Sequence, residues 1–239
     1  MPDIELTGSE TGPRATALRG ILERPSGAGP WPGVVMIHEV YGLDDVMRRQ
    51  AQRLASAGFL TLAIDLYSHG GARRCLVSTM RASLTGEGRA FLDIERARAW
   101  LTASPDCTGR VGLIGFCMGG NFALLSATAG FEAVAANYGQ VPRHVESVFD
   151  GACPIVASYG KRDWTLRGAA AKLAGALNRA GVIHDVKEYP DAGHSFLNDA
   201  DGGPRLLQPL QRVIGVRPEP VSAADAWQRI DAFFLEHLR

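Results

Sequence analysis

Cys117 stands between glycines in the segment GFCMGG at residues 115–120, where a sharp turn could present its thiol as a nucleophile. An apolar run at residues 110–114 suits a strand, and residues 121–129 have helical spacing. The segment matches the G-x-S-x-G nucleophile elbow, with cysteine in the serine position. The helix N–H groups would point at the sulfur, and a helix N-terminus lowers the pKa of a thiol. The segment therefore predicts a reactive cysteine.

Gly115 and Gly119 flank Cys117 at positions where a Cβ atom would crowd such a turn. The alternative for a free cysteine is a small apolar core residue, because cysteine is among the most buried residue types. The glycine frame favours the nucleophile for Cys117. The core interpretation is kept for the remaining cysteines, which are Cys75, Cys107 and Cys153.

A nucleophile of this kind needs a base, and the base needs a residue that orients it. The chain order in enzymes with this elbow is nucleophile, acid, histidine. His194 lies in a loop just after a short strand, so it is the predicted base, against the alternative of a surface-loop histidine. Asp163 follows the strand expected at residues 154–159 and is the predicted orienting acid. Asp191, which suits a turn, and Asp185, which suits a strand start, compete for that role.

Glu39 comes at the carboxyl end of the apolar run at residues 33–38, so it is expected to face the elbow. The alternative is a solvated loop carboxylate. A carboxylate near a thiol raises the pKa of the thiol or takes its proton. Val40 would then lie in the loop whose backbone N–H supplies half of an oxyanion hole, and the N–H of Met118 would supply the other half.

Strands that alternate with helices position these residues, and the alternation predicts an α/β fold with a mostly parallel central sheet and helices on both faces. Strands are expected at residues 16–24, 33–38, 59–64, 110–114, 131–138, 154–159 and 185–189. Helices are expected at residues 46–57, 91–101, 121–129, 167–180 and 223–238. Ligands of such sheets bind at the carboxyl ends of the strands, where the candidate residues fall.

Two helix ends and two connections complete the expected architecture. Asp44 or Asp45 is expected to cap the helix at residues 46–57, and Ser222 with Asp225 to form a capping box for the last helix. Residues 68–88, rich in glycine, serine and arginine, are expected to be an irregular binding or lid region. Residues 202–220 are interpreted as a surface excursion, so one domain spans residues 1–239.

Bulk composition restricts the class of protein. The chain has 239 residues, 46% of them hydrophobic, which suits one domain with a substantial core. Lys+Arg and Asp+Glu both number 25, so no charge excess favours nucleic acid or an anionic membrane as partner. No signal peptide, membrane span, C-x-x-C pair or zinc-ligand spacing is evident. We therefore expect a cytoplasmic monomer or homodimer with reduced thiols, no metal, no cofactor and a small-molecule substrate.

Six short motifs are similar to those of the dienelactone hydrolase family of α/β-hydrolases. They begin at His38 (HEVYG), Asp65 (DLY), Gly115 (GFCMGG), Tyr138 (YG), Gly160 (GKRD) and Gly193 (GHSF). The resemblance runs from about residue 15 to the C-terminus, and its most specific part is the G-x-C-x-G-G elbow with an upstream glutamate.

The resemblance implies a Cys-Asp-His triad of Cys117, Asp163 and His194 and hydrolysis of a small ester or lactone through an acyl-thioenzyme. It also implies that Glu39 pairs with Cys117 at rest, and that substrate binding makes this carboxylate take the thiol proton. A thiolate formed only at that point resists oxidation. The alternatives are a general carboxylesterase or thioesterase with the same residues, or a non-catalytic binding protein that keeps the pocket.

The resemblance has one departure, in the substrate-binding residues. Dienelactone-specific members have an arginine a few residues after the catalytic histidine, where this chain has Asn198. A second substrate-binding arginine would come from residues 68–88, and the candidates there are Arg81, Arg73 and Arg74. Aromatic residues near strand ends could wall a pocket or belong to the core or rim, and these are Tyr41, Tyr67, Tyr138 and Trp164.

Overall fold

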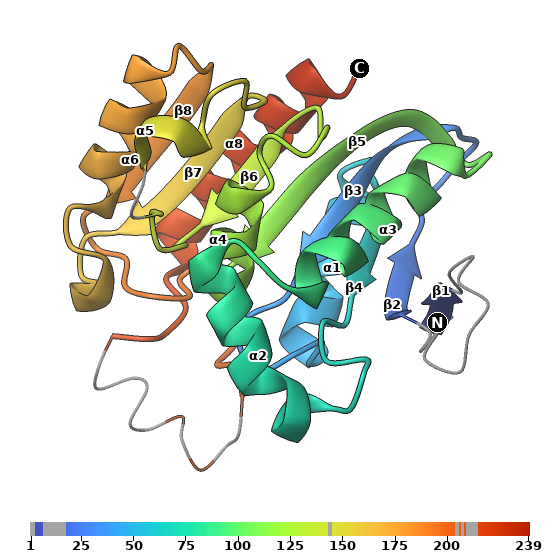
Figure 1. The fold of residues 1–239 in the computed structure, drawn as a ribbon, viewed down its shortest axis with the longest axis horizontal. Helices are drawn as coiled ribbons and strands as arrows, with labels where there is room; N and C mark the ends of the chain where they lie inside the picture. Colours follow the sequence, from blue (N-terminus) through green and yellow to red (C-terminus); the bar gives the residue numbers. More distant parts are fainter. Residues whose placement is uncertain (1–2, 7–17, 143–144, 204–205, 207, 209–214) are drawn as a thin grey trace.

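The fold is built on one eight-stranded sheet with the order β1-β2-β4-β3-β5-β6-β7-β8 (Figure 1). The computed structural model describes residues 3–6, 18–142, 145–203, 206, 208 and 215–239. Strand β2 pairs antiparallel with both β1 and β4, and every other neighbouring pair is parallel. The prediction of an α/β fold with a mostly parallel sheet is confirmed.

The described strands are β1 (Asp3–Leu6), β2 (Leu18–Glu23), β3 (Trp31–Ile37), β4 (Leu60–Ile64), β5 (Cys107–Phe116), β6 (Val134–Asn137), β7 (Ile155–Gly160) and β8 (His184–Tyr189). The described helices are α1 (Asp45–Ser56), α2 (Ala72–Thr85), α3 (Arg89–Ala103), α4 (Met118–Leu125), α5 (Val145–Val148), α6 (Ala169–Arg179) and α8 (Pro220–His237), with a 3₁₀ turn at Trp164–Leu166.

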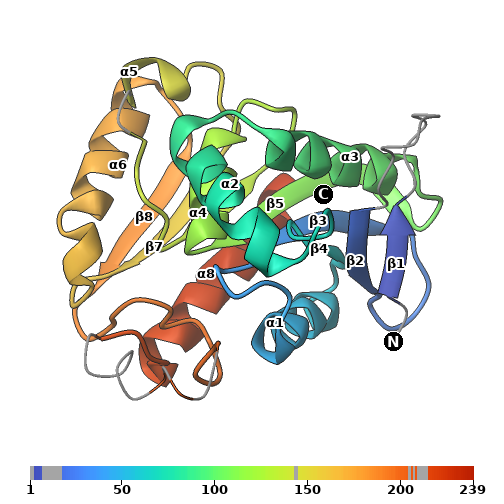
Figure 2. The same cartoon turned by 60° about the horizontal axis from the view of Figure 1, so that its bottom comes forward.

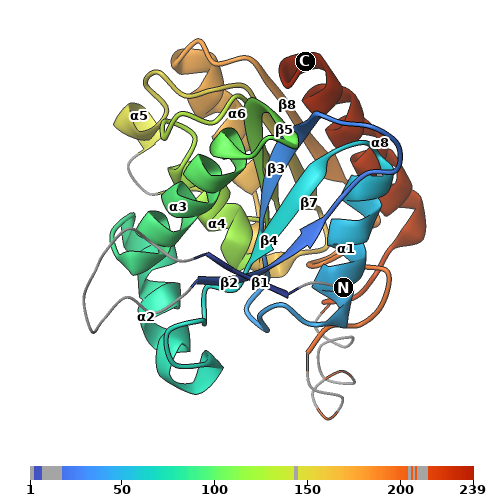
Figure 3. The same cartoon turned by 90° about the vertical axis from the view of Figure 1, so that its right-hand side faces the viewer.

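Helices cover both faces of the sheet, as Figures 2 and 3 show. Side chains along a strand alternate between faces, so Val35 and Ile37 of β3 join the apolar cluster under α2, α3, α4 and α6. Val34 and Met36 join the opposite cluster, under α1 and α8. Burial on both faces explains why β3 is a continuous apolar run, and it places the carboxyl ends of the parallel strands along one edge.

Two sequence predictions are wrong. Residues 68–88 contain the 14-residue helix α2, which begins after Gly71 and ends at Gly86 in a left-handed conformation, φ 79°. The last helix begins at Pro220 and is capped by Glu219, whose carboxylate accepts from the N–H groups of residues 221 and 222. The predicted capping box of Ser222 and Asp225 therefore does not form, because both residues lie inside the helix.

The other predicted elements are present with shifted ends, and Asp44 caps α1 by accepting from the N–H of Met47 at 3.0 Å. Of the expected edge strand, residues 16–17 lie outside the described residues, and so does part of the expected excursion at 202–220. No helix in the described part of the chain is long and apolar enough to cross a membrane.

Candidate active site

Cys117 sits at a strained turn between β5 and α4. Its backbone has φ 54° and ψ −113°, and it is the residue immediately before the first helical residue, Met118. A Cβ atom on Gly115 would lie 1.9 Å from the carbonyl oxygen of Gly119, and one on Gly119 would lie 2.4 Å from that of Ile37. Both glycines are therefore needed for the close approach of strand, turn and helix. The turn has the geometry of a nucleophile elbow.

His194 and Asp163 meet beside this turn. Nδ1 of His194 and Oδ2 of Asp163 are 2.5 Å apart, and the Asp163 side chain is only 1% exposed. Asp163 also accepts from the N–H of Thr165 at 3.0 Å and from its hydroxyl at 2.6 Å. Cys117 lies beside the imidazole, close enough for its side chain to raise the pKa of His194. The three sequence-predicted residues thus form one connected row.

His194 and Asp163 both have shifted pKa values. Burial lowers the pKa of His194, but the Cys117 thiolate and the hydrogen bonds with Asp163 and Cys117 outweigh burial and raise the pKa well above its ordinary value. Burial alone would raise the pKa of Asp163, but the hydrogen bonds from His194 and Thr165 hold it below its ordinary value. The arrangement favours an imidazolium paired with the Asp163 carboxylate.

Glu39 follows β3 and is buried beside the same histidine, with 5% of its surface exposed. Its Oε2 accepts from the side-chain amide of Asn198 at 3.2 Å, and Ser195 and Tyr138 lie beside the carboxylate. Burial raises the pKa of Glu39, although the positive charge of His194 opposes this shift. Among the described residues Glu39 accepts a hydrogen bond from Asn198 and forms none with Cys117, so pairing of Glu39 with Cys117 stays a prediction.

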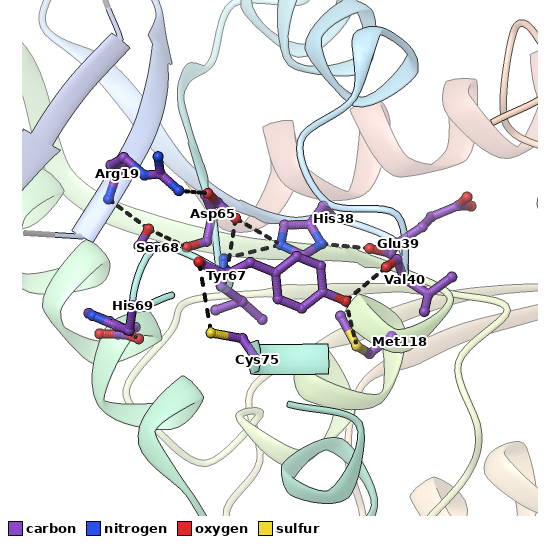
Figure 4. Close-up of polar contacts among 12 residues, drawn as sticks. Arg19, His38, Glu39, Val40, Asp65, Tyr67, Ser68, His69, Cys75 and Met118 are labelled. Carbon is purple, nitrogen blue, oxygen red and sulfur yellow. Dashed lines mark hydrogen bonds and ion pairs between the residues drawn. The ribbon is translucent and has the colours of Figure 1, made fainter. Parts of the chain in front are cut away.

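Val40 and Met118 lie on either side of the hydroxyl of Tyr67 (Figure 4). The hydroxyl donates to the carbonyl oxygen of Val40 at 2.8 Å and lies 4.0 Å from the sulfur of Met118. The N–H of Val40 donates to no backbone or side-chain acceptor among the described residues. Met118 is the first residue of α4, where N–H groups have no partner within the helix. Both N–H groups can therefore receive a ligand oxygen.

The candidate substrate-binding residues separate into two groups. Tyr67, Tyr138 and Asn198 are buried around the row, and Tyr41 is half-buried where it lines a small cavity beside Glu39 and Asn198. The remaining candidates stay in solvent, with Trp164 60% exposed and Arg81, Arg73 and Arg74 on exposed positions of α2.

The competing acids are occupied elsewhere. Asp191 is a turn residue that pairs with Arg162 at 2.5 Å, and Asp185 lies in β8 and pairs with Arg229 at 2.7 Å. The described residues contain no group of three or more His, Cys, Asp or Glu side chains that could hold a metal ion. Of the remaining cysteines, Cys107 is buried, and Cys75 and Cys153 are half-buried against the core.

Two further residues at the site had no role in the sequence interpretation. Ser195, next to the predicted base, adopts φ 57° and lies beside the carboxylate of Glu39. His38 ends the apolar run of β3, is fully buried and contacts the backbone of Glu39. An imidazole at the end of a strand buried on both faces is the signal that could have singled out His38.

Comparison with known proteins gives a family and several relatives. A model of the dienelactone hydrolase family matches residues 18–238. The carboxymethylenebutenolidase of Rhodococcus opacus is 27% identical over 234 residues, covering 91% of this chain and 86% of that protein. A dienelactone hydrolase-like promiscuous phosphotriesterase from metagenomic libraries has 25% identity and a TM-score of 0.75, over 94% of this chain and 95% of that one. Dienelactone hydrolase from Anabaena variabilis, 22% identical, shares the fold with a TM-score of 0.71, over 100% of this chain and 98% of that one.

Proposed function

This chain belongs to the dienelactone hydrolase family of carboxylic ester hydrolases, and on that premise we propose that it cleaves a small ester or lactone through an acyl-thioenzyme on Cys117. The observation that carries the proposal is the connected row of Cys117, His194 and Asp163, in which the imidazole contacts both neighbours. A nucleophile, a base and an orienting acid in contact are what acyl transfer through a covalent intermediate requires.

In the acylation step the sulfur of Cys117 attacks the acyl carbon, and the carbonyl electrons move to the oxygen. The N–H groups of Val40 and Met118 bind the resulting oxyanion. When the tetrahedral intermediate collapses, the alcohol or enol oxygen leaves with a proton from His194, and a thioester remains on Cys117. The raised pKa of His194 supports this role, because the imidazolium is the form that can donate.

Deacylation reverses the pattern with water as the nucleophile. His194, now neutral, takes a proton from water, and the hydroxide attacks the thioester carbon while the same two N–H groups bind the oxyanion. The C–S bond then breaks, the carboxylic acid is released, and the sulfur keeps the electron pair. Cys117 is then again a thiolate beside the protonated His194. Asp163 keeps the imidazole in one orientation throughout, because its carboxylate holds Nδ1.

The thiol proton has two possible acceptors. The contact between Cys117 and His194 favours His194 in the resting enzyme. Glu39, which the family resemblance implies, would act after its side chain turns from Asn198 towards the sulfur. A buried carboxyl with a raised pKa is suited to hold a proton, so Glu39 is proposed as the acceptor on substrate arrival.

The proposed substrate lacks a carboxylate next to the scissile bond. Asn198 is a neutral amide, and its N–H group is already engaged by Glu39 at 3.2 Å. A substrate carboxylate that replaced this contact would lie against the carboxyl group of Glu39, which disfavours binding of a second negative charge. Neutral esters and lactones fit this environment better.

The test is a panel of small lactones and p-nitrophenyl esters assayed with wild type and with Cys117→Ala. We expect turnover by wild type and its loss in the variant, and mass spectrometry of a rapidly quenched reaction should show an acyl adduct on Cys117. A rate that is equal in the two proteins, or an adduct on another residue, would overturn the cysteine mechanism. Broad turnover of activated esters and thioesters without lactone cleavage would favour the general carboxylesterase or thioesterase.

A non-catalytic binding protein gives a separate pattern. Wild type would turn over no ester in the panel, while a neutral lactone would still protect Cys117 from alkylation by iodoacetamide. Binding of that lactone would then be unchanged in Cys117→Ala.

A further inference from the structure

We propose that His38 is a positioning residue, which holds the Glu39–Val40 peptide so that the N–H of Val40 faces the oxyanion. The inference rests on the proposed function, since it explains how one of the two oxyanion donors is fixed. His38 has no contact with the sulfur of Cys117 among the interactions of the described residues, and it acts through the backbone of the loop after β3.

The carbonyl oxygen of Glu39 is held from two directions. Nδ1 of His38 lies 2.6 Å from it, and the N–H of Gly42 donates to it at 3.1 Å. That oxygen and the N–H of Val40 belong to the same peptide unit, which is planar and trans, so they point in opposite directions. Fixing the oxygen therefore fixes the direction of the N–H, which donates to no acceptor among the described residues.

The hydrogen bonds of His38 define its tautomer. The N–H of Leu66, just after β4, donates to Nε2 of His38 at 3.1 Å, so the proton of the neutral ring is assigned to Nδ1. His38 is 0% exposed, and burial lowers its pKa, although the bond to Glu39 and the carboxylates of Asp65 and Asp44 oppose this shift. A neutral ring with one acceptor and one donor matches the two backbone groups that it joins.

A second contact fixes the next peptide unit. The hydroxyl of Tyr67 donates to the carbonyl of Val40 at 2.8 Å, and the ring of Tyr67 packs against His38 with a centroid distance of 5.0 Å. Both contacts come from the segment after β4, so this segment grips the loop after β3 on both sides of Val40 (Figure 4). Loss of either contact would free one peptide plane and leave the other held.

The segment after β4 is itself held by contacts with β2. Asp65 accepts from the N–H of Tyr67 at 2.9 Å and pairs with Arg19 of β2 at 2.9 Å. The N–H of Arg19 donates to the hydroxyl of Ser68 at 2.9 Å. The chain of contacts therefore runs from β2, in the antiparallel part of the sheet, through the turn after β4 to the Glu39–Val40 peptide.

Substitution of His38 tests the proposal with p-nitrophenyl acetate as the probe. His38→Leu removes donor and acceptor, whereas the shorter amide of His38→Asn can still donate to the Glu39 carbonyl. We expect kcat to fall about 10- to 100-fold in His38→Leu with KM nearly unchanged, which is less than removal of an oxyanion donor costs. In His38→Asn we expect most of this loss to be recovered.

Alkylation of Cys117 by iodoacetamide separates positioning from general damage. This reaction displaces iodide from carbon and forms no oxyanion, so its rate reports the thiolate and its access alone. We expect the alkylation rate to stay within about twofold of wild type in both His38 variants. A parallel fall of alkylation and kcat, or equal kcat values for the leucine and asparagine variants, would overturn the proposal.

Tyr67→Phe gives a variant with lower risk to folding, because only a hydroxyl is lost. We expect kcat to fall roughly two- to tenfold, as for loss of one hydrogen bond. We call the hold of His38 and Tyr67 on the two peptide units around Val40 the clamp. An unchanged kcat in Tyr67→Phe together with an unchanged kcat in any folded His38 variant would refute the clamp.

Failure of the proposed function can be told from failure of the clamp by amide hydrogen exchange, which needs no turnover. If wild type hydrolyses no ester, the proposed function is wrong. The clamp still requires faster exchange of the Gly42 amide in His38→Leu, because that amide donates to the Glu39 carbonyl that His38 also holds. Exchange equal to wild type would refute the clamp whatever the activity.

Discussion

The side-chain amide of Asn198 donates a hydrogen bond to the carboxylate of Glu39 at 3.2 Å, joining the loop after β3 to the loop after β8. The second oxygens of both side chains, Oε1 of Glu39 and Oδ1 of Asn198, are buried and have no hydrogen-bond partner in the described part of the chain. Burial raises the pKa of this carboxyl, although the charge of His194 and the hydrogen bond from Asn198 oppose the shift. The proposed role of Glu39 as proton acceptor therefore depends on a carboxylate that is held at rest by a neutral amide.

Replacement of Glu39 by glutamine should slow acylation and leave the fold intact. Glutamine keeps the size of the side chain and a hydrogen bond with Asn198, but it cannot take the thiol proton. We expect the burst of p-nitrophenolate in rapid-mixing experiments to slow about 10- to 100-fold. Glu132→Gln, on an exposed pair with Arg110, is the control and should match wild type. An unchanged burst in Glu39→Gln would remove Glu39 from the mechanism.

Asn198→Arg should shift specificity towards esters that carry a carboxylate. A guanidinium at this position can form a bidentate pair with a substrate carboxylate. We expect the kcat/KM ratio of a carboxylate-bearing to a neutral ester to rise roughly tenfold, and competition between the two esters measures it directly. Asn198→Gln keeps the amide and should leave the ratio near the wild-type value. A similar rise in both variants would mean that pocket shape, and not charge, sets the preference.

Asp163→Asn should inactivate the enzyme, whereas Asp191→Asn should not. Asparagine at position 163 can present an N–H group to Nδ1 of His194 and so disfavour the required tautomer. In comparable triads this change lowers kcat by as much as about 10,000-fold, and we expect a loss of at least about 100-fold here. Asp191 pairs with Arg162 at the surface and serves as the matched control. If steady-state kinetics showed equal losses of kcat in Asp163→Asn and Asp191→Asn, the orienting role could be assigned to neither residue alone.

The interaction of Asp163 with His194 should make stability depend on pH in the acid range. The folded-state pKa of Asp163 is depressed, so its contribution is present above the ordinary aspartate pKa of about 3.9 and is lost as pH falls through the folded-state value. Urea unfolding should therefore show a difference between wild type and Asp163→Asn that shrinks as the solution is acidified below about pH 4. A difference that stayed constant down to strongly acidic pH would contradict this assignment.

Gly119→Ala should destabilise the fold, because the new Cβ would lie 2.4 Å from the carbonyl oxygen of Ile37, and backbone must move. We expect a loss of about 1–3 kcal/mol in the free energy of unfolding. Gly175, in α6, is the contrasting case, since a Cβ there meets only Arg179 Nη1 at 3.5 Å. Gly175→Ala should stabilise by about 0.5–1 kcal/mol. Denaturant titration measures both changes in the free energy of unfolding. Equal changes in the two variants would mean that the backbone of the elbow can move to accept the new Cβ atom.

Much of the fold follows from local patterns, and the helix α2 shows where such patterns fail. The fully buried residues of α2 are small or polar, Thr79, Ala82 and Ser83, and its larger apolar residues are only partly buried, like Leu76 and Met80, or exposed, like Val77 and Leu84. Because helix prediction relies on a stripe of large apolar residues, the glycine, serine and arginine of this segment predict irregular chain instead. For β3 the rule of a continuous apolar run at a doubly buried strand held.

The site was predictable where position along the chain determines position in space. Cys117, Asp163 and His194 follow parallel strands, whose carboxyl ends meet at one edge, so their order and spacing were enough to bring them together. The contacts of His38 could not be predicted in the same way. They depend on one ring orientation and on the N–H of Leu66, 28 residues away, and neither leaves a periodic trace in the sequence.

The order of residues along the chain has a consequence for the newly made protein. Cys117 and the elbow glycines are synthesised well before His194, and α8, which packs beneath the last strands, comes at the very end. Domains form on the ribosome from the N-terminus onward. A nascent polypeptide can therefore acquire the thiol turn while the predicted base is still missing, so we expect the proposed catalytic residues to come together only when the final fifth of this chain has docked.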